Sequence, residues 1–192
     1  MFGNFVIMIK NFLIYFLLII TVFCSGYKKP PKYVIEADKN AFFHNNLGLN
    51  YLKDRVYYAA IQEFKIAISL SPSTQASAIF YNNLGETYNF IGYPDQALPC
   101  FEDALKLYGL NLKYYHNLVQ TYIQLGLLDA KIQEFSTSSN VYDRIKLGML
   151  YIELGEVRKG IGILDEICIS EPDLLITPAL KAYLKEVIEQ KL

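Results

Sequence analysis

Few side chains in this sequence could take part directly in chemistry. The 192 residues contain two histidines, His44 and His116, and three cysteines, Cys24, Cys100 and Cys168. No cluster of His, Cys, Asp and Glu residues has the spacing of a metal site, and no Gly-Lys motif for binding phosphate is present. The sequence therefore predicts no catalytic site, metal site or cofactor, and we expect a protein that is not an enzyme.

The balance of charge narrows the classes of partner. The chain has 18 basic and 19 acidic residues, so it lacks the basic excess that nucleic-acid-binding proteins usually carry. Three cysteines are too few for a disulfide-rich secreted scaffold. We expect no nucleic-acid partner, and we expect Cys100 and Cys168 to be small residues of the core or its boundary.

Cys24 differs from the other two cysteines because it ends an apolar run. The segment from Phe12 to Phe23 has no charged residue. As a helix it would span about 18 Å, less than the roughly 30 Å of a bilayer core, which is the length of a signal-peptide apolar region. If the segment is counted from Phe5, only Lys10 and Asn11 interrupt it, and it could then span a membrane.

The residues around Cys24 resemble a bacterial lipoprotein processing site, at which the cysteine becomes the new N-terminus and carries the lipid. Ser25 and Gly26 fit that pattern, whereas Phe23 stands where the family prefers a small residue. An uncleaved anchor, or cleavage after Gly26 with release, remain alternatives. Residues 1–24 are therefore expected to be a signal or an anchor, and the chain to be associated with a membrane of the bacterial cell envelope.

The segment after Cys24 has the composition of a tether. Residues 25–38 include Pro30-Pro31, which favours an extended backbone. Lysines at 28, 29 and 32 follow the apolar run, and only Lys10 precedes it. The positive-inside rule therefore favours a second orientation, with the rest of the chain in the cytoplasm.

An internal repeat organises the rest of the chain. Asn-Asn-Leu-Gly occurs at 45–48 and again at 82–85, and related tetrapeptides occur at 116–119 and 145–148. Around each of them, large residues recur at helical spacing, as in Tyr81, Leu84 and Tyr88. One helical hairpin cannot bury such a stripe alone, so the repeats must stack on one another.

This pattern resembles the tetratricopeptide-repeat family, whose period is 34 residues. The resemblance divides residues 39–174 into units 41–74, 78–111, 112–140 and 141–174. In the first two units the family's small and large positions fall on Leu47, Gly48, Tyr51, Ala60, Phe64, Ala67, Pro72, Tyr81, Leu84, Gly85, Tyr88, Ala97, Phe101 and Ala104. Val119 replaces the glycine in the third unit, and Gly160 replaces the alanine in the fourth. The resemblance implies an all-α fold, a right-handed α-solenoid of about four hairpins.

Two departures from the repeat are predicted. Ser136-Thr137-Ser138-Ser139-Asn140 favours turns over helix, so the second helix of the third unit should be short. Residues 177–192 should form a C-terminal capping helix, with Ala182, Leu184, Val187 and Ile188 covering the end of the stack.

The resemblance also implies a concave groove lined by the first helix of each unit. From the family's groove positions we select a set with apolar ends and a polar, amide-rich middle: Phe42, Asn45, Leu49, Asn82, Glu86, Asn89, Phe90, Lys113, His116, Gln120, Tyr142 and Met149. The carboxylate clamp of chaperone-binding relatives is not expected, because Asn45, Leu49 and Asn117 stand where its other ligands should be. His44 is expected to be structural.

These patterns predict a membrane-tethered scaffold for protein–protein interactions in cell-envelope assembly. Its ligand should be a protein or peptide in the groove, held by apolar anchors. The alternative is an obligate structural subunit of a larger membrane complex. The two differ in whether the domain without residues 1–26 is monomeric and soluble.

Overall fold

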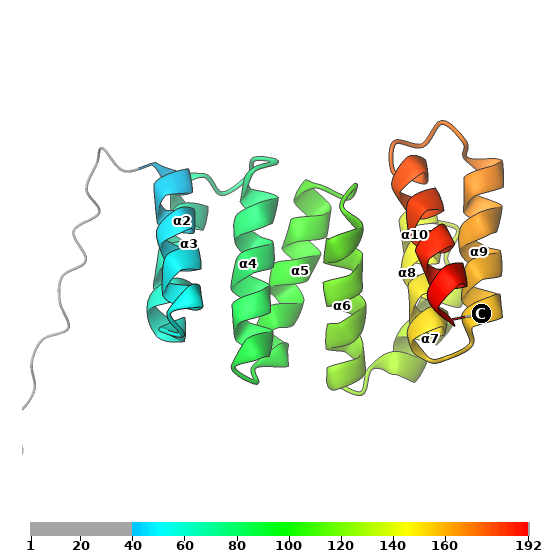
Figure 1. Ribbon diagram of the computed structural model, residues 1–192, viewed down its shortest axis with the longest axis horizontal. Helices are drawn as coiled ribbons and strands as arrows, with labels where there is room; N and C mark the ends of the chain where they lie inside the picture. Colours follow the sequence, from blue (N-terminus) through cyan, green and yellow to red (C-terminus); the bar gives the residue numbers. More distant parts are fainter. Residues whose placement is uncertain (1–39, 192) are drawn as a thin grey trace, which may run out of the picture. The chain divides into compact units, whose positions relative to one another are not determined.

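The computed structural model describes residues 40–191, which form nine α-helices and no strand (Figure 1). The helices are α2 (Ala41–Lys53), α3 (Tyr57–Leu70), α4 (Ser77–Phe90), α5 (Pro94–Leu107), α6 (Leu112–Gln124), α7 (Leu128–Ser136), α8 (Val141–Glu153), α9 (Val157–Ser170) and α10 (Thr177–Lys191). All of them belong to one compact unit, Ala37–Leu192. The expected all-α fold of repeated helical hairpins is confirmed.

The predictions made for the N-terminus lie outside the described residues. They concern the signal or anchor at 1–24, the lipid on Cys24 and the tether at 25–38. Within residues 40–191, none of the helices has the length and apolar character needed to cross a membrane.

The helices pair into four hairpins. We call α2, α4, α6 and α8 the A helices and α3, α5, α7 and α9 the B helices. Three of the turns between A and B helices contain a glycine with positive φ, at Gly92 (84°), Gly126 (68°) and Gly155 (86°). Arg55 takes this place in the first hairpin with φ 62°, a backbone conformation that favours glycine.

A close contact between an A-helix glycine and a large B-helix side chain fixes three of the hairpins. A Cβ on Gly48 would lie 2.6 Å from the Phe64 ring, and one on Gly85 would lie 2.7 Å from the Phe101 ring. A Cβ on Gly148 would lie 2.7 Å from Leu164. Each glycine therefore lets the B helix approach closely, as its position in the repeat predicts.

The third hairpin lacks these small residues and is open. Val119 stands where the other A helices have glycine, and Lys131 stands where the other B helices have Ala60, Ala97 or Gly160. The helices α6 and α7 consequently make few contacts with each other, and α7 runs obliquely to α6 (Figure 1). As predicted, α7 is short, with nine residues where α3, α5 and α9 each have 14.

The last helix covers the end of the stack. The helix α10 packs against α9, and Leu184 and Val187 are buried there as predicted. Ala182 and Ile188 were predicted to pack with them, but both are exposed, Ile188 by 47%. Both side chains stay open to solvent, so that part of the prediction is wrong.

A buried polar pair joins the two helices of the first hairpin. His44 Nδ1 lies 2.7 Å from Glu63 Oε2, and both side chains are largely shielded from solvent. The other ring nitrogen of His44, Nε2, is buried and has no hydrogen-bond partner among the described residues. The structural role expected for His44 is therefore seen as a link between α2 and α3.

Candidate functional site

The four A helices contact one another in order, α2 to α4, α4 to α6 and α6 to α8. We call their shared surface the A-helix wall. Its residues come from the groove positions of the repeat, so it is the place where the structure tests the geometry expected for the groove.

Exposed apolar side chains lie on three helices of this wall, α2, α4 and α8. Phe90 is 69% exposed, Phe42 52%, Leu49 40% and Tyr142 38%. The Phe42 ring meets Phe80 edge to face, with 5.4 Å between ring centroids. These four predicted groove residues are therefore available to a ligand, although each already touches the protein through part of its surface.

Phe90 lies beside a recess between the first two hairpins. Its ring is 5.0 Å from the ring of Tyr57, measured between centroids. A cavity of about 320 Å³ lies there, lined by Leu52, Lys53, Arg55, Tyr57, Glu86 and Phe90. The exposed ring and this recess together could seat an apolar side chain of a bound segment.

The amides of the wall bind one another across the helices. The hydrogen bonds that cross between A helices are Asn83 Nδ2 to Asn45 Oδ1 (2.9 Å), Asn117 Nδ2 to Asn82 Oδ1 and to Glu86 Oε1 (both 2.8 Å), Asn89 Nδ2 to Thr121 Oγ1 (2.8 Å) and Gln120 Nε2 to Glu153 Oε2 (2.7 Å). We call this set the amide ladder. It joins each A helix to the next.

The ladder changes the role of several predicted groove residues. Asn45 and Asn82 are 5% and 2% exposed, and the Oδ1 atom of each already accepts a hydrogen bond from the neighbouring helix. Met149 is 1% exposed in the core. Asn89 is partly buried, and its Oδ1 has no partner within the described part of the chain. The structure therefore gives Asn45, Asn82 and Met149 places inside the fold rather than on its surface.

Basic and acidic side chains are paired with each other in the middle of the wall. Lys113 Nζ donates to Glu86 Oε1 at 2.7 Å, and His116 Nδ1 lies 4.0 Å from Glu153 Oε1. Lys113 is well exposed, so this ion pair is screened by solvent and contributes little to stability. Asn83 and Lys113, which match the chaperone-tail clamp, are thus already paired with Asn45 and Glu86.

The open third hairpin contains a second recess, which sequence reasoning did not identify. A cavity of about 640 Å³ lies between the end of α5 and helices α6, α7 and α8. Tyr115, Tyr122, Phe135 and Tyr142 line it, together with Lys131 and Lys146. Two features of the sequence indicated this recess: Val119 and Lys131 at the two small positions of the repeat, and the short α7. They did not predict its size, because the size depends on how far the hairpin opens.

The cysteines of the described region are structural. Cys100 and Cys168 are free and buried. Burial raises the pKa of the Cys100 thiol to about 12, so the thiol stays protonated. In residues 40–191 no group of three His, Cys, Asp or Glu side chains could hold a metal ion.

Comparison with known proteins places a family repeat in the second hairpin. The tetratricopeptide repeat model matches residues 78–109. No curated protein matches the chain.

Several solved structures are similar to this chain at low identity. MamA is 19% identical over 78% of this chain and 86% of that protein, with a TM-score of 0.47. A tetratricopeptide repeat protein from Parabacteroides merdae is 17% identical over 78% of this chain and 60% of that protein, with a TM-score of 0.49. PilF from Pseudomonas aeruginosa is 16% identical over 77% and 68%, with a TM-score of 0.48.

The family match falls on α4 and α5, the hairpin that carries Tyr81, Leu84, Gly85, Tyr88, Ala97, Phe101 and Ala104 at signature positions of the repeat. The resemblance stated from the sequence is confirmed there. The chain thus contains a tetratricopeptide repeat at residues 78–109, within an all-α array of packed helical hairpins.

Proposed function

We propose that this protein is a binding scaffold that holds a peptide segment of a partner protein on its A-helix wall. Stacked helical repeats present extended surfaces that suit this task. The observation that carries the proposal is the set of exposed apolar side chains on successive A helices, Phe42 and Leu49 on α2 and Phe90 on α4.

The exposed anchors supply the affinity in this proposal. Fully burying a Phe or Leu side chain contributes about 1.5–3 kcal/mol, and aromatic residues often dominate the energy of an interface. Phe90 beside its recess is the strongest anchor because it is the most exposed of these side chains and has a cavity next to it. Phe42 and Leu49 lie one hairpin away, so the bound segment must span α2 and α4.

Polar groups of the wall orient the segment. Glu86 lies on α4, and Lys113, His116 and Gln120 lie on α6, the next A helix; all four keep some exposure. Their pairing leaves spare hydrogen-bonding capacity, since a lysine ammonium has three donors and only one contact holds it here. An extended or helical peptide backbone can use these groups without displacing the amide ladder.

The proposal extends to a membrane tether. The apolar run that ends at Cys24 supports attachment at a membrane, either through a lipid on that cysteine or through an uncleaved anchor. The partner would then be another protein of the bacterial cell envelope. An obligate subunit of a membrane complex would also use this wall, and it differs in being bound permanently.

Position-specific crosslinking in native membranes tests the binding surface. A photoreactive benzoylphenylalanine replaces Phe90 in the full chain, and in a control it replaces Ile169, an apolar residue of α9 that is 73% exposed. We expect a discrete adduct from position 90 that Phe42→Ala with Leu49→Ala reduces. Equal adducts from both positions would show that the wall is not the site. An adduct of fixed stoichiometry that survives purification would favour the permanent subunit.

Lipid attachment has its own test. Cys24→Ser is expressed in the native host, with Cys168→Ser as a matched control. We expect Cys24→Ser alone to lose membrane association or to accumulate an unprocessed form. Unchanged size and unchanged membrane retention would favour an uncleaved anchor.

A further inference from the structure

The cavity in the open third hairpin has features of a built site. Its volume of about 640 Å³ lies within the range of small-molecule sites, roughly 300–1,000 Å³. It exists because Val119 and Lys131 keep α7 away from α6 and because α7 ends at Ser136. In a full-length B helix, the second half would fill this space. Here side chains line the space, but no helix of the described region covers it.

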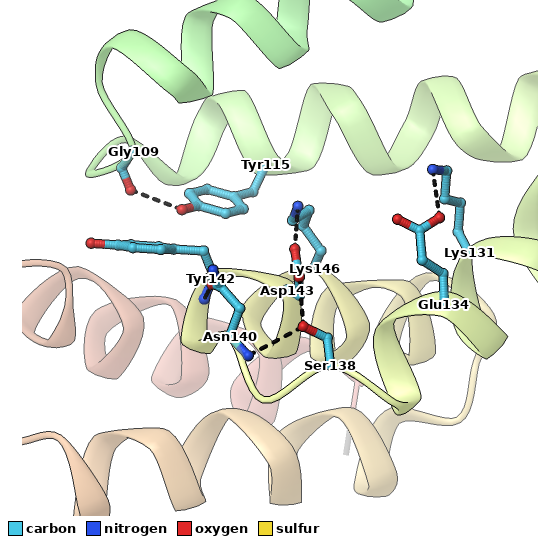
Figure 2. Close-up of polar contacts among 9 residues, drawn as sticks. All are labelled: Gly109, Tyr115, Lys131, Glu134, Ser138, Asn140, Tyr142, Asp143 and Lys146. Atoms are coloured by element: carbon cyan, nitrogen blue, oxygen red, sulfur yellow. Dashed lines mark hydrogen bonds and ion pairs between the residues drawn. The ribbon is translucent and has the colours of Figure 1, made fainter.

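Aromatic side chains form much of the wall of this cavity. Tyr115 and Tyr122 come from α6, Phe135 from α7 and Tyr142 from α8. Tyr115 is fixed by its hydroxyl, which donates to the carbonyl of Gly109 at 2.9 Å (Figure 2). Tyr142 is 38% exposed and stands at the edge of the cavity. Such walls favour a flat, apolar ring in the ligand.

Two lysines are held inside the cavity by carboxylates and by aromatic faces. Lys131 Nζ lies 2.8 Å from Glu134 and 5.1 Å from the centroid of the Tyr122 ring. Lys146 Nζ lies 2.6 Å from Asp143 and 4.7 Å from the centroid of the Phe135 ring. Figure 2 shows the Lys146–Asp143 pair beside Tyr115 and Tyr142, and the Lys131–Glu134 pair farther from the two tyrosines. The lysine side chains are only 22% and 18% exposed, so the protein covers most of each.

Two exposed carboxylates, Glu102 and Glu134, also line the cavity, whereas the less exposed Lys131 and Lys146 keep unused donors. Both oxygens of Asp143 have a partner, since Oδ1 binds Lys146 and Oδ2 accepts from Ser138 at 2.7 Å. Each ammonium has three donors, and one carboxylate contact holds each of them. Burial raises the pKa values of Tyr115 and Tyr122, so both phenols stay protonated. The group that complements the free donors of Lys131 and Lys146 is an acceptor, above all an anionic one.

We propose that this cavity binds a small organic acid that carries an aromatic ring. The ring lies among Tyr115, Tyr122, Phe135 and Tyr142, and the carboxylate accepts hydrogen bonds from Lys146 and Lys131. This site is separate from the Phe90 recess of the A-helix wall, so it does not depend on the peptide-binding proposal. Occupancy would also brace the open hairpin, because the ligand touches α6, α7 and α8 together.

The test uses fluorine NMR with the full chain in mild detergent. The probe is 4-fluorophenylacetate, and 4-fluorophenylacetamide is the uncharged control ligand. We expect a saturable change in the acid's fluorine signal that weakens about tenfold in Lys146→Gln, the loss of one charge-assisted contact. Lys113→Gln, which changes the A-helix wall, should bind the acid as the natural protein does.

Three outcomes would overturn the proposal. They are the lack of saturable binding of the acid, equal binding by Lys146→Gln, and equal binding of the amide. Circular dichroism checks that Lys146→Gln remains folded. Tyr142→Ala is the second variant, because a half-exposed side chain can be removed with little risk to folding, and it should also weaken binding of the acid. Normal binding by Tyr142→Ala would contradict the assigned cavity.

Discussion

Single residues decide how closely the helices of each hairpin approach. We predict that Gly85→Leu lowers the free energy of unfolding by about 1–3 kcal/mol or more, because its side chain would overlap Phe101. Thermal and urea unfolding measure the change.

Gly162→Ala is the matched control for that variant. A Cβ on Gly162 would have no heavy atom within 4 Å, and the residue lies inside α9. Alanine there should stabilise by about 0.5–1 kcal/mol, since glycine is unfavourable within a helix. If Gly85→Leu melted like the natural protein, the packing of α4 on α5 would differ from the one described.

The buried pair of the first hairpin gives a second prediction at this scale. Removing the imidazole in His44→Ala leaves Glu63 buried without its partner, which typically costs about 3–5 kcal/mol. The comparison is Lys185→Ala, which breaks an exposed pair with Glu189 and should change stability by at most about 1 kcal/mol. Similar effects of the two variants on unfolding would mean that His44 and Glu63 are not paired in solution.

Among the helices, α7 has the weakest support. It is the shortest helix of the described region, and Phe135 is its only buried residue. Few buried contacts allow local opening at low free energy, so backbone amides of α7 should exchange with solvent faster than those of α5. Hydrogen exchange followed by mass spectrometry measures this difference. Phe135→Ala should speed exchange in α7 far more than in α2, and protection of α7 equal to that of α5 would contradict the open hairpin.

Helix positions were predictable because the repeat encodes them locally. Large residues at helical spacing located the A helices, and the hydroxyl run after Phe135 located the early end of α7. The burial of Asn45, Asn82 and Met149 was not predictable from the repeat alone. It depends on side chains of the neighbouring A helix, such as Asn83 and Asn117, which reach across to positions that a single unit leaves open.

At the scale of the described domain, binding should depend on apolar anchors rather than on charge. The charged groups of the wall are already paired, as with Lys113 and Glu86, and the chain as a whole carries a net charge of -1. Raising salt shortens the distance over which charges act, from about 10 Å at 0.1 M to about 3 Å at 1 M. Contacts made by Phe42, Leu49 and Phe90 are insensitive to that change.

We therefore predict a specific pattern for the affinity of a partner identified by crosslinking at position 90. Phe90→Ala should weaken binding about tenfold or more, since a buried aromatic anchor contributes about 1.5–3 kcal/mol. Ile169→Ala removes an equally exposed apolar side chain from α9 and should leave the affinity unchanged. Asn82→Ala is unsuitable as a probe, because its loss would disturb the amide ladder between α4 and α6. Calorimetric titrations at 0.05 M and 0.5 M salt complete the test, and we expect the dissociation constant to change by less than about threefold. Binding that disappears at high salt while Phe90→Ala binds normally would mean that Glu86, Lys113 and His116 hold the partner instead.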